Sequence, residues 1–372
     1  MDTRKENARR NADEAARGGP WTIATLLFSG SLALVIGVGL GLRWLGKGHV
    51  SWQSIVGGLC LLAGLGLVAA GAAQVGRARS RLVRAGLVVV ALSLVAVLVW
   101  TLSPALIATM VPPTAHGAVT PADFGLEASE VTFRTRDGVT LWGWYVPSRH
   151  GAAVVLRHGS GETASDVLAQ AEVLAESGYG VLATDGRGHG RSGGDAMDFG
   201  WFGDLDVEAA VSFLIGQPDV DPHRIGVVGM SMGGEEAIGA AAFDQRIAAT
   251  VAEGASARTE EDKAWLVDDY GWRGWLQLRL EWLQYAVADL LSPAKKPQSL
   301  AISAGQMAPR HVLLVTAGER PDEGQAARFI QSAAGDHVII WTVPGADHIQ
   351  GLEASPTEWR EHVVGFLDRE LG

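Results

Sequence analysis

Three long stretches without a charged residue fill most of the first third of this 372-residue chain, at residues 21–42, 55–75 and 85–110. A helix needs about 20 apolar residues to cross the hydrocarbon core of a bilayer, and each stretch is long enough. Buried helices of soluble proteins are usually shorter, and a cleaved signal peptide has an apolar core of only about 7–15 residues. The sequence therefore predicts three membrane-spanning helices within residues 21–111. Glycines recur in the first two stretches, where they either let helices pack closely or are simply tolerated.

Lys and Arg alternate in number across these stretches. Residues 1–20 carry five, the 43–54 loop two and the 76–84 loop four, and none follows Met110 until Arg134. Short cytoplasmic flanks are enriched in Lys and Arg, so the pattern predicts a multi-pass protein of the cell membrane. Its basic leader, residues 1–20, would be cytoplasmic and everything after Met110 extracytoplasmic. No ionisable residue lies within a stretch, which argues against a transporter or a proton relay.

The rest of the chain is acidic. Residues 1–111 hold 11 Lys and Arg against 4 Asp and Glu, whereas residues 112–372 hold 19 against 37. This balance argues against nucleic-acid binding. The lone cysteine, Cys60, excludes an intrachain disulfide and a zinc site built on cysteines, and we expect no metal and no other cofactor. Residues 112–128 are rich in Pro, Ala and Gly, which is typical of a linker to a soluble domain at residues 129–372.

Strand and helix patterns alternate through that domain, which predicts an α/β fold with a mostly parallel sheet covered by helices on both faces. Asp137-Gly138 is a hairpin signal and places antiparallel strands at one edge. The expected strands are 130–135, 139–146, 152–157, 180–184, 224–229, 246–253, 312–317 and 338–343. The expected helices are 164–176, 205–215, 232–242, 323–334 and 356–371.

The strongest chemical signal is a G-x-S-x-G pattern, Gly229-Met230-Ser231-Met232-Gly233. It lies directly after an apolar strand and directly before a helix, which is the context that a nucleophile elbow requires. Side chains two positions before and after the serine would clash with neighbouring backbone in so sharp a turn. The pattern predicts Ser231 as a nucleophile whose hydroxyl stands clear of the sheet.

Two further motifs follow other strands at the same sheet edge. His158-Gly159-Ser160-Gly161 can supply a backbone N–H, for which we favour Ser160, and this group would form an oxyanion hole together with the Met232 N–H. His348 follows the last strand and is predicted as the general base. The other histidines have simpler interpretations, with His116 in the linker and the rest solvated at element edges: His223, His311, His337 and His362.

The acid that would orient His348 should follow the strand at 312–317, where three carboxylates are available. Glu319, Asp322 and Glu323 all fit the chain order serine, acid, histidine. Glu319 is close to the strand end. Asp322 and Glu323 can both swing toward the histidine, and we favour Glu323 with Asp322 as the alternative.

These motifs carry a resemblance. Residues 129–372 resemble the α/β-hydrolase superfamily, in particular its esterases, thioesterases and dipeptidyl-peptidase-like serine hydrolases. The segment from Asp185 to Ser192, DGRGHGRS, is similar to the D-x-R-G-H-G-x-S loop of that family, which shapes the site without taking part in the chemistry. The crowded acidic loop departs from the family pattern, which usually shows one clear Asp.

The resemblance and the motifs together predict a membrane-anchored serine hydrolase that cleaves a carboxylic ester or a thioester through an acyl-enzyme. Its partners would be that substrate and the lipid bilayer. Two alternatives stay open: an acyltransferase or perhydrolase with the same triad, and a catalytically idle membrane receptor or scaffold. The sequence carries no signal for an oligomeric state.

A Trp-rich segment at 258–295 is a candidate lid, since this superfamily commonly inserts lids before the strand that bears the acid. Trp272, Trp275 and Leu276 begin a stripe at helical spacing, which continues through Leu283, Val287 and Leu290. Three interpretations are open: a lid over the acyl pocket, a helix that packs this stripe on the sheet, or a helix that rests in the bilayer interface.

Overall fold

The computed structural model describes residues 20–42, 45, 50, 52–75, 81–111 and 114–372. The chain divides into two compact units, Met1–Val111 and Pro112–Gly372, and each is described here by itself. The predicted orientation in the membrane rests on Lys and Arg in the basic leader and in the two loops. Most of these residues lie outside the described residues.

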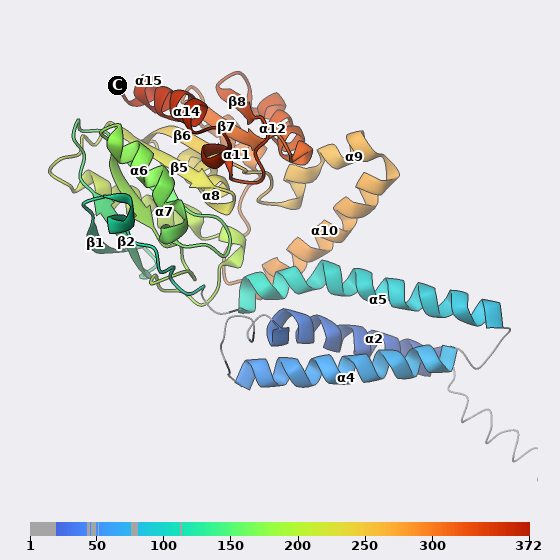
Figure 1. Ribbon diagram of the computed structural model, residues 1–372. Coiled ribbons are helices and arrows are strands. Elements are labelled where there is room, and N and C mark those ends of the chain that lie inside the picture. The colour runs from blue at the N-terminus through green and yellow to red at the C-terminus, as the bar shows by residue number, and fades with distance from the viewer. Residues whose placement is uncertain (1–19, 43–44, 46–49, 51, 76–80, 112–113) are drawn as a thin grey trace, which may run out of the picture. The chain divides into compact units, whose positions relative to one another are not determined.

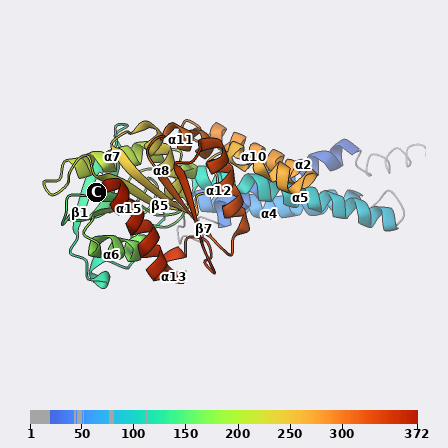
Figure 2. The same cartoon turned by 90° about the horizontal axis from the view of Figure 1, so that it is seen from above.

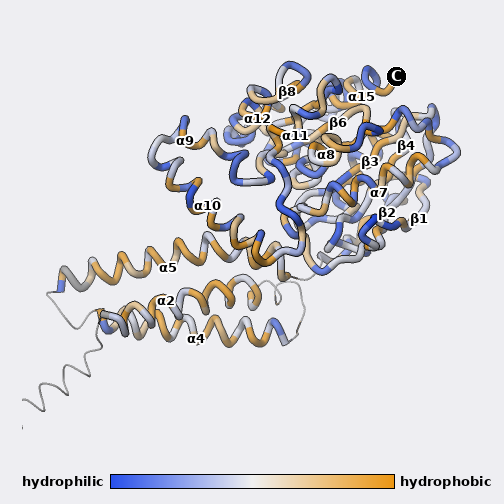
Figure 3. The backbone as a smooth tube through the Cα atoms, turned by 180° about the vertical axis from the view of Figure 1, so that it is seen from behind, coloured by the Kyte–Doolittle hydropathy of each residue, from blue (hydrophilic) through white to orange (hydrophobic). Residues whose placement is uncertain are grey.

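The first unit contains three long apolar helices. They are α2 (Pro20–Ile36), which continues as a π-helical turn through Leu42, α4 (Trp52–Val75) and α5 (Arg81–Met110). Each is long and apolar enough to cross a membrane, as predicted, and Figure 3 shows their mostly hydrophobic colouring. Some glycines allow close approach: a Cβ on Gly57 would lie 2.3 Å from the Gly41 nitrogen, whereas Gly58 faces open space.

The second unit is built on one eight-stranded sheet in the order β1-β2-β4-β3-β5-β6-β7-β8. Strands β3 to β8 are parallel, and β2 is antiparallel to both of its neighbours, β1 and β4. The predicted parallel sheet with an edge hairpin is confirmed. The strands are β1 (Ser129–Arg134), β2 (Thr140–Val146), β3 (Ala153–Arg157), β4 (Gly180–Thr184), β5 (Ile225–Met230), β6 (Ile247–Glu253), β7 (Val312–Ala317) and β8 (Val338–Val343).

Helices cover both faces of this sheet (Figures 1 and 2). On one face, α6 (Leu168–Glu176) and the C-terminal helical segment pack against β2 to β7 around fully buried Trp359 and Phe366. On the other, the core is formed by α7 (Gly203–Ile215), α8 (Met232–Phe243), α11 (Leu300–Gln306) and α12 (Pro321–Ala334). The three-layer arrangement buries β3, β4, β5 and β7 completely, which is why they are continuous apolar runs.

Two segments differ from the sequence-based expectation. The helix expected at 356–371 consists of α14 (Pro356–Trp359) and α15 (Gly365–Leu371), joined by a π-helical turn at Arg360–Val364. Part of the expected linker is fixed on the second unit: Thr114 pairs with Gly188 and Gly190 through backbone hydrogen bonds, and a short helical turn forms at Pro121–Phe124. Its composition predicts a connection but not the contacts that order it.

The Trp-rich segment forms α9 (Trp265–Tyr270) and α10 (Trp272–Leu291). The expected stripe is mostly exposed, with Trp272 at 71% and Leu290 at 83% exposure. The buried residues of α10 lie on its opposite side: Gly274, Glu281, Tyr285 and Ala288. The interpretation that this stripe packs on the sheet is therefore wrong.

Candidate active site

Ser231 lies on the tight turn between β5 and α8. Its φ of 51° and ψ of −119° form a backbone conformation that residues other than glycine rarely adopt. The neighbouring glycines make the turn sterically feasible. A Cβ on Gly229 would lie 2.2 Å from the Gly233 carbonyl oxygen, and one on Gly233 would lie 2.6 Å from that of His158. The clashes expected from the sequence are thus present, and the turn holds Ser231 at the carboxyl end of the parallel strands.

A chain of hydrogen bonds joins Ser231 to a histidine and a carboxylate from distant parts of the sequence. The Ser231 hydroxyl and His348 Nε2 are 2.9 Å apart, and His348 Nδ1 is 2.6 Å from Glu323 Oε1. The second oxygen of Glu323 accepts the Ala317 N–H at 2.9 Å, which fixes the buried carboxylate. The hydrogen bond and the negative charge of Glu323 raise the pKa of His348, although its partial burial acts in the opposite direction.

The other two acidic residues of this loop point elsewhere. Asp322 Oδ1 accepts a hydrogen bond from the Tyr270 hydroxyl at 3.1 Å, and Glu319 is exposed. Of the three carboxylates that the chain order allows, the structure brings Glu323 to His348. The difference arises at the start of α12, where Glu323 faces the sheet and Asp322 faces outward.

The loop after β3 lies beside Ser231. Ser160 and Met232 line the same pocket as Ser231, and among the described residues neither of their backbone N–H groups has an acceptor. The Gly159 N–H donates instead to Glu162 at 2.8 Å. The two residues predicted to form an oxyanion hole therefore border the pocket, and no acceptor among the described residues occupies their N–H groups.

The D-x-R-G-H-G-x-S segment hydrogen-bonds the loop after β3. The Gly161 N–H donates to His189 Nε2 at 3.2 Å, and the Gly186 N–H donates to His158 Nε2 at 2.8 Å. The Ser192 hydroxyl donates to the Asp185 carbonyl at 2.7 Å. These contacts are structural, and burial lowers the pKa of His158 so that its ring stays neutral.

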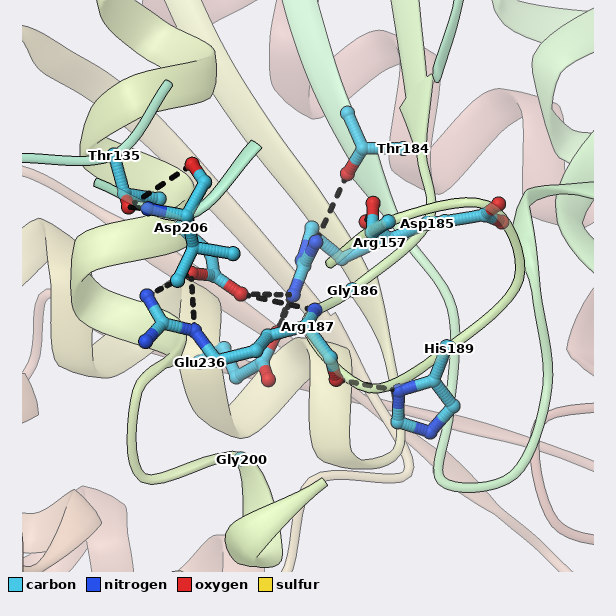
Figure 4. A network of polar contacts seen from close by, with 12 residues as sticks. Thr135, Arg157, Thr184, Asp185, Gly186, Arg187, His189, Gly200, Asp206 and Glu236 are labelled. Atoms are coloured by element: carbon cyan, nitrogen blue, oxygen red, sulfur yellow. Dashed lines mark hydrogen bonds and ion pairs between the residues drawn. The ribbon is translucent and has the colours of Figure 1, made fainter. Parts of the chain in front are cut away.

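A buried network of charges surrounds Arg157 (Figure 4). Arg157, the last residue of β3, donates to Glu236 Oε2 from Nε at 2.9 Å and from Nη2 at 2.5 Å, and to the Thr184 hydroxyl at 2.9 Å. Asp206 lies 3.9 Å from Arg157 and accepts from Arg187 at 2.9 Å. Sequence reasoning missed this network, because nothing local to these residues marks them as partners.

Glu253 connects three parts of the site. Its carbonyl accepts the Ser231 N–H at 2.7 Å. Its buried carboxylate accepts the Gly351 N–H, just after His348, at 2.8 Å and the Trp359 indole N–H at 2.9 Å. Burial raises the pKa of Glu253. Ser231, the loop that carries His348 and the C-terminal helices are thereby connected through one residue.

A pocket of about 150 Å³ opens beside Ser231. It contains a carboxyl group that the sequence analysis missed: Glu235 Oε1 accepts the Ala257 N–H at 3.1 Å, and burial raises the pKa of Glu235 to about 7. Its position one helical turn after Ser231 could have drawn attention to it. The other lining residues are Ser160, Met197, Phe199, Met232, Ala257, Arg258 and Tyr285.

Other predictions about single histidines were only partly right. His116 is not a free linker residue, since its ring hydrogen-bonds Asp185 at 3.0 Å and packs edge-on against Trp142. His311 hydrogen-bonds Glu370, and His337 hydrogen-bonds the Ala304 carbonyl. Among the described residues, no group of three or more His, Cys, Asp or Glu side chains is arranged to hold a metal ion.

Comparisons with known proteins agree with this architecture. Residues 148–309 match the family model described as serine aminopeptidase, S33. A thiohydrolase, aneE, of Aspergillus aculeatus is 39% identical over 128 residues, which cover 32% of this chain and 39% of that protein. A polyketide transferase, ATR5, of Stachybotrys chlorohalonatus is 37% identical over 132 residues, 33% of this chain and 43% of that protein. The chain thus spans about two fifths of the length of these relatives.

Solved structures match over a longer range. The esterase Pf2001 of Pyrococcus furiosus aligns with 71% of this chain and 99% of its own, with a TM-score of 0.57 and 26% identity. The α/β hydrolase GrgF of Penicillium aligns with 66% of this chain and 99% of its own, with a TM-score of 0.51 and 21% identity. The sheet order, the turn after β5 and these similarities show that the second unit has the α/β-hydrolase fold.

Proposed function

We propose that this protein is a membrane-anchored serine hydrolase that cleaves a carboxylic ester or a thioester, with Ser231, His348 and Glu323 as its catalytic triad. The observation that carries the proposal is the unbroken chain of hydrogen bonds from the elbow serine through the imidazole to a buried carboxylate. This arrangement matches the roles of nucleophile, general base and orienting acid. It does not favour an idle receptor or scaffold.

In this mechanism the Ser231 oxygen attacks the carbonyl carbon as its proton passes to His348 Nε2. Glu323 stabilises the resulting imidazolium, and the N–H groups of Ser160 and Met232 bind the developing oxyanion. The bond to the leaving oxygen or sulfur then breaks, and His348 gives its proton to that group. Water attacks the acyl-enzyme and passes a proton to His348, which returns it to the departing Ser231 oxygen.

The pocket beside Ser231 supports a short acyl group, because its 150 Å³ is below the ~300–1,000 Å³ of pockets for drug-sized ligands. Tyr285 lines this pocket from α10, which supports the segment 258–295 as its lid.

Purified full-length protein tested on aryl esters and acyl thioesters of increasing chain length should prefer the shortest chains. Turnover no faster than that of Ser231→Ala on every substrate would contradict the proposal.

An acyltransferase with the same triad is the second candidate, because one relative is named a polyketide transferase. The two activities differ in the group that accepts the acyl chain from Ser231. Product analysis with competing alcohols separates them, since a transferase forms new esters while water is in large excess.

We propose that the three apolar helices anchor the protein in the cell membrane. Because Lys and Arg alternate across these helices, we place the N-terminus in the cytoplasm and the second unit, Pro112–Gly372, outside the cytoplasmic membrane. We call this second unit the hydrolase unit. Protease added to intact spheroplasts should then remove the region after Met110, as detected with an epitope tag at the C-terminus. Protection of the tag until lysis would reverse the topology.

The pH dependence of turnover should report the His348–Glu323 pair. His348 acts as a base only when neutral and its pKa is raised, so kcat/KM should rise with pH with a midpoint above 6.5. Glu323→Gln removes the charge that stabilises the imidazolium, so the midpoint should move to lower pH and the plateau should fall by about 10²–10⁴-fold. Asp322→Asn is the matched control and should leave both unchanged. A midpoint that moves in Asp322→Asn and not in Glu323→Gln would assign the acid to Asp322.

A further inference from the structure

Helix α10 presents an apolar face that no described part of the hydrolase unit covers. Figure 3 shows hydrophobic and hydrophilic positions alternating along it. Helical spacing brings to one side the residues that we call the Trp face: Trp272 (71% exposed), Trp275 (51%), Leu276 (45%), Trp282 (52%) and Leu290 (83%). Elsewhere on this unit, exposed large apolar residues such as Phe243 and Ile302 are scattered along other elements. The Trp face is therefore a concentrated interaction surface.

The residues on and beside this face suit the boundary between lipid headgroups and acyl chains. Trp is the residue that most favours that depth, and Leu can extend into the acyl region. Arg273 lies over the Trp272 ring at 5.7 Å and Arg279 over Trp275 at 5.5 Å, so each cation accompanies an aromatic ring. Guanidinium groups in this position can bind lipid phosphates.

The connection to the first unit keeps the hydrolase unit close to a membrane. Helix α5 ends at Met110, and Thr114 already pairs with the hydrolase unit through its backbone. Four residues of extended chain span at most about 14 Å. A bilayer crossed by α5 therefore stays within reach of the hydrolase unit. Once the apolar helices are inserted, contact between the hydrolase unit and the same bilayer is intramolecular, so even weak contacts become effective.

We infer that the Trp face of α10 docks into the headgroup region of the bilayer that holds the three apolar helices. The inference rests on the proposed membrane anchoring. The occupant is a lipid surface of no particular charge, because residues 265–291 contain two Arg against four acidic residues, Asp268, Asp269, Glu281 and Asp289. Apolar insertion, and not attraction to anionic lipid, provides the driving force.

Spin labels on the full-length protein in phosphatidylcholine nanodiscs test this inference. Single cysteines are placed on a Cys60→Ser background at Leu276 and Leu290 of the Trp face. Leu94→Cys on α5 is the reference for bilayer depth. Phe243→Cys is the reference for water, because Phe243 is 62% exposed at the end of α8 and does not belong to the Trp face. The measured quantities are the relaxation rates produced by oxygen and by a water-soluble nickel chelate.

Labels at Leu276 and Leu290 should be accessible to oxygen and protected from the chelate, as at Leu94, and Phe243 should show the reverse. The result should be the same at 0.1 and 1 M salt and with added anionic lipid. Chelate accessibility at Leu276 and Leu290 equal to that at Phe243 overturns the docking while Leu94 remains protected. A Leu94 label in water overturns the membrane anchoring itself.

Two further measurements sharpen the result. Trp272→Ser with Trp275→Ser should raise chelate accessibility at Leu290 several-fold, whereas the exposed control Ile302→Ser should not change it. Dipolar broadening between labels at Leu276 would show that a second copy of the chain covers the Trp face, which also overturns the inference. The seven substituted positions other than Cys60 are each at least 45% exposed, so the variants should fold: Leu94, Phe243, Trp272, Trp275, Leu276, Leu290 and Ile302.

Discussion

Ser231→Ala is expected to abolish labelling by a fluorophosphonate probe and to lower kcat by roughly 10⁶-fold. The nucleophile, base and acid act as a unit, so the loss of the nucleophile alone removes nearly all of their contribution. Residual turnover from the oxyanion hole can survive, which makes covalent labelling the cleaner measurement. The label is detected by fluorescence of the full-length protein after gel electrophoresis.

Ser160→Ala is the matched control, because Ser160 lines the same pocket and would contribute only its backbone N–H. Its hydroxyl contacts the Met197 sulfur at 3.0 Å and no other described group. Labelling should therefore persist in Ser160→Ala. Persistent labelling of Ser231→Ala would show that the nucleophile lies elsewhere.

Arg157→Met is expected to lower the free energy of unfolding of the hydrolase unit by about 3–5 kcal/mol, since removing one partner leaves a buried charge unpaired. Arg157 is 1% and Glu236 3% exposed, so water cannot replace the lost hydrogen bonds. The loss should be larger at pH 8 than at pH 5. Burial raises the pKa of Glu236, and the charge of Arg157 lowers it. In the variant the effect of burial remains without that charge, so the buried Glu236 carboxyl is tolerated when protonated. It destabilises the fold as the pH rises and the carboxyl ionises.

Thermal unfolding in detergent measures this effect, with two controls. Arg360→Met breaks an exposed pair with Glu176 and should cost less than about 1 kcal/mol. The double variant Arg157→Met with Glu236→Leu should recover most of the stability, because apolar side chains of similar volume tolerate burial. A single variant as stable as the wild type would show that the buried pair does not stabilise the fold.

The architecture of the hydrolase unit was predictable because the central strands of its sheet are buried on both faces. The apolar runs at β4, β7 and β8 begin and end where the sequence analysis placed them. Strands that are completely buried, such as β4 and β7, allow few polar positions, so their boundaries are visible in the sequence. The C-terminal helix was predicted in extent but not in its π-helical turn, which depends on how Trp359 and Phe366 fit the core.

The site was predictable only where chemistry constrains the backbone. Any side chain at Gly229 or Gly233 would clash with neighbouring backbone, so the turn requires these glycines and can be recognised from the sequence. The choice between Asp322 and Glu323 depends on which way two adjacent side chains of α12 face, which chain order cannot specify. Glu235 and the Arg157–Glu236 pair were missed, because their environments come from segments far apart in the sequence.

Helix α10 shows the opposite limit. Its apolar periodicity was recognised, but a periodic stripe states only that some apolar surface exists and not what covers it. The structure shows Tyr285 and Glu281 turned inward and the Trp residues turned outward. Glu281 is held by Lys263 at 2.5 Å, a pairing that no local pattern predicts.

The role of Trp359 and Leu371 in the core has a consequence for the order of events during synthesis. Trp359 and Leu371 belong to the same hydrophobic cluster as side chains from β2 to β7. This half of the core can therefore pack completely only after the last turn of α15 has left the ribosome. The apolar helices at the start of the chain emerge long before. In the proposed topology, the intervening polypeptide would therefore still be unfolded while it is threaded across the membrane, and Glu253 could align the histidine loop only after export is complete.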